Sequence, residues 1–217
     1  ATPQLRSADV LATFRADLDR HRREVVEGWA GLDDAVLSAR PAPRKWSAID
    51  CLEHCRRANA MYLGHMDRAI AAAEGRGRRP VETFHPGLVG ERMRRTLEPG
   101  SPAGDPSPSS GPADARAANA KRRIGLRMKT FGGYDPVKDA TPPDPREALR
   151  RFDEQLGRMK DMAERMERVD LHTRTNTLVG PLLRLRIGDV ARYLVAHTDR
   201  HLVQADRAIE GATSPRA

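Results

Sequence analysis

The chain has 217 residues, of which 39% are hydrophobic, only 4% are aromatic and 31% are charged. This length suffices for one domain with a sizeable core, which aliphatic side chains and methionine must largely fill. No apolar run approaches the ~20 residues of a membrane span, so we expect no insertion into a membrane.

The net charge of +8 is concentrated in the middle of the chain. Residues 75–130 carry 12 basic and 5 acidic side chains, whereas residues 1–74 and 131–217 are nearly balanced. A basic segment can bind nucleic acid or another anionic surface. Because no aromatic residue interleaves with the charges between Arg92 and Lys129, the sequence favours a solvated, arginine-rich insertion over a nucleic-acid interface.

The first expected helix covers residues 7 to 29. Apolar side chains recur on it at spacings of three and four, which indicates a helix with one buried face. Its seam consists of Leu11, Phe14, Leu18, His21 and Val25. We interpret His21 as a satisfied core or boundary histidine.

A strong helix start follows the loop expected at 31–45. Ser47 is a good N-cap, and Asp50 three residues later resembles a capping box, which predicts a helix over residues 47–74. Trp46, just before the cap, could pack against Cys51 as a hydrophobic staple. The seam expected on this helix consists of Cys51, His54, Ala58, Met61 and His65.

Residues 75–144 are expected to be a long, irregular, Pro/Gly-rich and basic insertion. The run 99–112 has the composition of a flexible linker. The stretches 88–97 and 124–131 are interpreted as short helical or irregular segments laid over the end of a bundle.

Two further helices are expected in the last third of the chain. One covers residues 145–169, where regularly spaced methionines indicate core packing rather than a ligand set. After a loop through Gly180, the last begins near Ile187, and its seam carries His197 and His201 where aliphatic residues would be expected. Together the patterns predict one all-α domain, 1–217: a four-helix bundle with a long crossover connection between its second and third helices.

Three histidines of this bundle are candidate metal ligands. His197 and His201 are four residues apart, so they project from one helix face about 6 Å apart. His54 on the second helix could supply a third imidazole, and imidazole suits zinc, nickel and copper. Three protein ligands leave coordination positions open, which is typical of catalytic rather than structural sites. A polar core layer of satisfied histidines is the alternative.

The two cysteines indicate a reduced, cytoplasmic protein. Cys51 and Cys55 are four apart on one expected helix, which is poor geometry for a disulfide. Cys51 could reach the metal site as a fourth ligand or redox partner. The pattern favours the interpretation of both cysteines as small buried residues.

Both ends of the chain resemble one family. Residues 45–54, KWSAIDCLEH, resemble the "KWS…EvLeH" segment of the DinB/YfiT-like superfamily of metal-dependent hydrolases and thiol transferases. Residues 197–204, HTDRHLVQ, resemble its closing "H-x-x-[HR]-H-x-x-Q" helix. The resemblance covers roughly 8–74 and 145–210, and the family's three metal-binding histidines match His54, His197 and His201. The insertion at 75–144 is longer and richer in proline than this family leads us to expect.

The resemblance implies a divalent metal, zinc or nickel, that activates water or a low-molecular-weight thiol. Family members resemble hydrolases, thiol-S-transferases that use bacillithiol or mycothiol, and a thiol-dependent maleylpyruvate isomerase. The excess of arginine over lysine, 33 to 5, hints at a GC-rich genome and hence at mycothiol. We expect a small-molecule substrate, and the sequence leaves a homodimer open. The alternatives are a non-enzymatic metal-binding bundle and a DNA-damage or stress-associated protein that binds nucleic acid through its basic middle.

Overall fold

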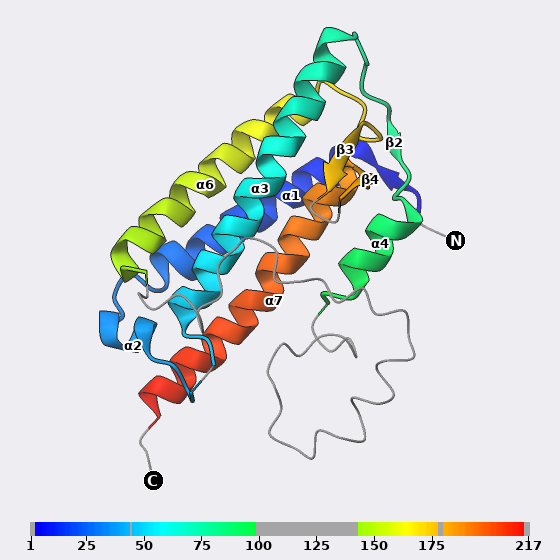
Figure 1. The fold of residues 1–217 in the computed structure, drawn as a ribbon. Coiled ribbons are helices and arrows are strands. Elements are labelled where there is room, and N and C mark those ends of the chain that lie inside the picture. The colour runs from blue at the N-terminus through cyan, green and yellow to red at the C-terminus, as the bar shows by residue number, and fades with distance from the viewer. Residues whose placement is uncertain (1–2, 44, 99–142, 178–179, 215–217) are drawn as a thin grey trace, which may run out of the picture.

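The computed structural model describes residues 3–43, 45–98, 143–177 and 180–214. Four long helices lie along the molecule (Figure 1): α1 (Ser7–His21), extended by the π-helical segment η1 (Arg22–Glu27), α3 (Ala48–Gly75), α6 (Pro145–Met166) and α7 (Ile187–Thr213). α1 and α3 each pack against both α6 and α7, so they occupy diagonally opposite corners of the bundle. The predicted all-α four-helix bundle is confirmed. Within the described ranges, no helix has both the length and the apolar character needed to cross a membrane.

The connection between α3 and α6 crosses the length of the bundle, because these two helices run in parallel (Figure 1). Its described part contains β2 (Thr83–Phe84), which pairs with β1 (Leu5–Arg6), and α4 (Leu88–Arg95). α4 packs along the first half of α7, where buried Glu91 accepts a hydrogen bond from Arg192 at 2.8 Å. Residues 88–95 are therefore helical, one of the two conformations expected for 88–97, whereas 99–112 and 124–131 lie outside the described residues.

Two expected loops contain regular structure. The stretch before α7 forms an antiparallel hairpin of β3 (Arg174–Thr177) and β4 (Gly180–Arg186), with Thr175 opposite Leu185. The prediction of a plain loop there was wrong, because alternating side chains allow β3 to bury Thr175 and Thr177 on one side. The loop after α1 contains the short helix α2 (Asp34–Ser38).

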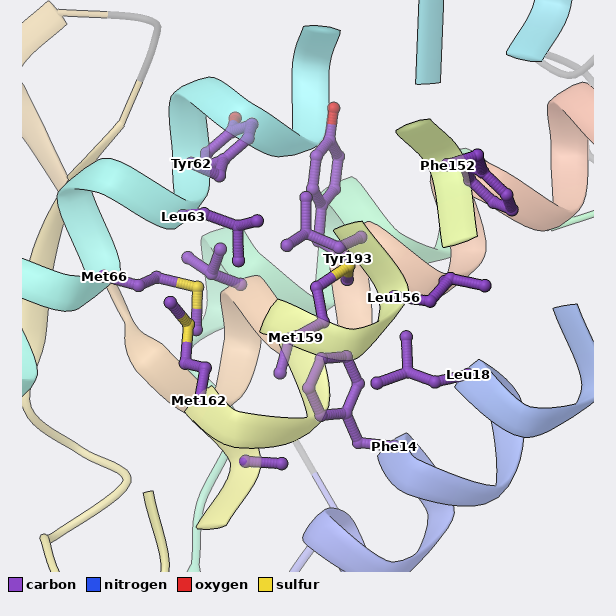
Figure 2. Close-up of a cluster of buried hydrophobic side chains, with 14 of the residues drawn as sticks. Phe14, Leu18, Tyr62, Leu63, Met66, Phe152, Leu156, Met159, Met162 and Tyr193 are labelled. Carbon is purple, nitrogen blue, oxygen red and sulfur yellow. The ribbon is translucent and has the colours of Figure 1, made fainter. Parts of the chain in front are cut away.

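The core lies between the four long helices (Figure 2). All residues of the seam predicted on the first helix are buried. On α6, Leu149, Phe152, Leu156 and Ala163 are buried, and the methionines at 159 and 166 are core residues as expected. The residues labelled in Figure 2 are Phe14, Leu18, Tyr62, Leu63, Met66, Phe152, Leu156, Met159, Met162 and Tyr193.

The seam predicted on α3 was wrong in its second half. Met61 is 42% exposed, whereas Tyr62, Met66 and Ile70 are buried. Every residue from 48 to 55 is buried, so the pattern in the first two turns does not mark a single inner face. Beyond those turns the inner face is centred on Tyr62, about 100° round the helix from Met61.

Candidate metal centre

His54, His197 and His201 meet in the interior between α3 and α7. All three are buried, and one ring nitrogen from each lies within 4.8 Å of the other two. The Nε2 atoms of His54 and His197 are 3.3 Å apart. The ring centroids of His54 and His201 are separated by 4.6 Å, and those of His197 and His201 by 4.7 Å. The structure thus brings together the three residues selected from the sequence.

This geometry fits a metal ion. Tetrahedral ligation at about 2.0–2.1 Å places ligand nitrogens about 3.3 Å apart, which is the separation of the His54 and His197 Nε2 atoms. Two facing nitrogen lone pairs repel unless one nitrogen carries a proton or a cation lies between them. The group could therefore hold a divalent ion.

Burial keeps these imidazoles neutral. It lowers the pKa of His54 to about 4. It also lowers the pKa of His201 to about 3, with a further contribution from the charge of His54. The pKa of His197 is lowered well below its ordinary value, first by burial and then by the two other histidines. Neutral imidazole is the form that ligates metals, so near neutral pH little proton competition opposes binding.

The outward nitrogens of the three rings have different environments. Nδ1 of His201 donates to Oε1 of Gln204 at 3.2 Å, since an amide oxygen can only accept. This bond fixes the tautomer in which Nε2 keeps its lone pair for an ion. The Nδ1 atoms of His54 and His197 are buried and have no hydrogen-bond partner within the described ranges.

The acidic residues next to the ligands in sequence are engaged elsewhere. Glu53 binds Arg56 and Arg57, each at 2.6 Å. Asp199 accepts hydrogen bonds from His21 at 2.7 Å and from Arg20 at 2.8 Å. His21 is 1% exposed, so the interpretation of it as a satisfied core histidine is confirmed. Both carboxylates are therefore paired with basic side chains rather than directed at the triad.

Both cysteines are buried thiols. Burial raises the pKa of Cys51 and of Cys55, which keeps both protonated. Neither belongs to the group of potential ligands around His54, and Cys51 packs in the hydrophobic core. The structure favours the interpretation as small buried residues over a fourth ligand.

A cavity of about 580 Å³ lies on another face of α7. Residues from α1, α4 and α7 line it, among them Val195, Ala196 and Asp199. Val195 and Asp199 lie about 160° round the helix from His197, so the cavity and the triad face opposite sides of α7. We place the candidate chemistry at the triad, because the cavity lining does not include any of the three histidines.

Comparisons with known proteins bear on this arrangement. A family model described as the DinB superfamily matches residues 17–205, which include all three histidines and most of the bundle. Neither the search of curated proteins nor that of solved structures found a match. By its matching family model, the chain belongs to the DinB superfamily.

Proposed function

We propose that the protein is a metal-dependent enzyme of the hydrolase, thiol-S-transferase or thiol-dependent isomerase type. The observation that carries this proposal is the approach of three buried imidazoles, His54, His197 and His201, from two helices. A divalent ion such as zinc or nickel held there would lower the pKa of a bound water or thiol and supply a nucleophile near neutral pH. Three protein ligands would leave positions for that molecule and for the substrate.

The surrounding residues support this role through electrostatics. The group of possible ligands is three neutral histidines, and Glu53 is paired with arginines, so the ligands themselves would not compensate the charge of an ion. An uncompensated positive charge in a buried site favours an anionic ligand, and a thiolate is such a ligand. Gln204 contributes by orienting His201.

A second candidate is a non-enzymatic metal-binding bundle, and one observation favours it. The acidic residues beside the ligands, Glu53 and Asp199, are held by arginine and are not free to act as general bases. In an enzyme built on this triad, the general base would therefore be a group of the substrate, of the thiol or of the molecule bound at an open position of the metal. The nucleic-acid alternative depends on the 12 basic residues of 75–130, half of which lie outside the described residues.

Cobalt substitution tests the proposal. The cobalt-loaded protein should change its visible absorption when N-acetylcysteine or mycothiol is added, because sulfur ligation alters the spectrum. The change should vanish in His201→Ala and survive charge reversal at Arg122 and Arg123. A cobalt site that ignores thiols and supports no hydrolysis of ester or amide substrates would favour the non-enzymatic bundle. Salt-sensitive DNA binding that the arginine changes weaken would favour the nucleic-acid alternative.

A further inference from the structure

The indole of Trp46 lies against two of the three triad histidines. Its ring is stacked on His201, with centroids 5.6 Å apart and an interplanar angle of 14°. It also contacts His54, at 5.0 Å and 54°. Trp46 precedes α3, which carries His54, whereas His201 lies on α7. A single half-buried side chain therefore contacts ligands from both helices.

The backbone beside this indole is firmly fixed. The amide N–H of Asp50 donates to Ser47 Oγ at 3.1 Å, and the amide N–H of Ser47 donates to Asp50 Oδ2 at 2.9 Å. Arg40 donates to both oxygens of Asp50, at 2.9 and 3.2 Å, and Asp50 is fully buried. This capping box and ion pair hold the residue that follows Trp46, so the indole is carried by a rigid helix start.

Packing takes the place of a hydrogen bond at His54. Metal-binding histidines commonly donate their second nitrogen to a carboxylate or carbonyl, which sets the orientation of the ring. His201 has Gln204 for this purpose, but the buried Nδ1 of His54 has no such partner in the described chain. The contact with the indole of Trp46 instead restricts the orientation of the His54 ring, because the indole packs against this ring.

We propose that Trp46 is a positioning residue of the metal centre, which holds the rings of His54 and His201 in ligating orientation and shields them from water. This inference rests on the proposed metal-binding function. The staple between Trp46 and Cys51 stays a prediction from sequence and does not conflict with this role.

Two substitutions at position 46 test the inference. Trp46→Leu should weaken cobalt or zinc binding by about 10-fold or more, measured by chelator competition, and should alter the cobalt absorption spectrum. Trp46→Phe keeps an aromatic face and should restore most of the affinity and the spectrum. Trp29→Leu is the control, since Trp29 is a core residue: it should lower thermal stability and leave metal affinity unchanged.

The outcomes separate this inference from the proposed function. Wild-type protein that binds no metal would refute both. Metal binding in the wild type, with unchanged affinity and spectrum in Trp46→Leu, would refute only the role of Trp46. If Trp46→Leu does not fold, a Trp29→Phe variant provides the test through its fluorescence. The chain has two tryptophans, so the emission of this variant comes from Trp46 alone. Cobalt should quench its emission in step with loading of the site, and unquenched emission would overturn the inference.

Discussion

Two kinds of buried histidine face opposite sides of α7, and they differ in their partners. His21 lies against a carboxylate, with its Nε2 2.7 Å from Oδ1 of Asp199. The triad histidines instead face one another, and the Nε2 atoms of His54 and His197 are 3.3 Å apart. A carboxylate satisfies a single histidine and stabilises the fold. Grouped imidazoles that face one another present nitrogen lone pairs that can ligate a cation.

The largest expected effect is the loss of metal when a triad histidine is removed. His197→Ala should reduce bound zinc or nickel from about one equivalent per chain to near zero, because it removes one of three ligands. The bundle should remain folded by circular dichroism. Metal analysis of protein purified without a histidine tag measures the loss.

Asp199→Asn is the matched change on the other face of α7. It should keep the metal, but lower the free energy of unfolding by about 1–3 kcal/mol, because His21 loses its charged partner. Urea denaturation measures this effect. Metal loss in Asp199→Asn, or full metal content in a His54→Ala/His197→Ala double variant, would remove the distinction between the two groups.

Acid should destabilise the metal-free protein through the triad. Burial lowers the pKa of His201 from 6.5 to about 3, so between pH 7 and 5.5 the unfolded chain takes up a proton here that the folded chain does not. Stability should therefore fall as pH falls through this window, by about 1 kcal/mol for each such histidine. Urea denaturation in EDTA at pH 7 and at pH 5.5 should show that the free energy of unfolding falls less in His201→Gln than in the wild type. Equal losses would mean that the folded triad protonates as readily as the unfolded chain.

The sequence contained enough information for the bundle and for the triad. Leu11, Phe14 and Leu18 on α1 mark a buried face, as do Leu149 and Phe152 on α6, because a long amphipathic helix repeats its pattern over many turns. The triad was predictable because His197 and His201 stand at apolar positions of a strong seam. The hairpin before α7 was missed, although apolar and charged residues alternate in Leu183-Arg-Leu-Arg186. A short strand repeats this alternation too few times to distinguish it from a loop.

Other features depend on contacts that no local pattern encodes. The stacking of Trp46 on His201 joins residues 155 positions apart, and the ion pair of Arg20 with Asp199 joins residues 179 apart. The inner face of α3 was misplaced at Met61 because complete burial of residues 48–55 hides which side faces the bundle. Long-range packing decides each of these, so they became visible only in three dimensions.

The smallest expected effect comes from giving the triad a carboxylate like that of His21. Gln204 accepts from Nδ1 of His201 at 3.2 Å as a neutral amide. Gln204→Glu should bind that N–H more strongly and raise the basicity of Nε2, so zinc affinity should rise about threefold to tenfold. Gln204→Ala should lower it by a similar factor, because the ring loses its only hydrogen-bonded orientation within the described structure. Chelator competition at pH 7 measures both changes. If Glu weakens binding as much as Ala does, the amide is required for its shape or its N–H donors, and a neutral side chain at position 204 would then be a condition for metal binding.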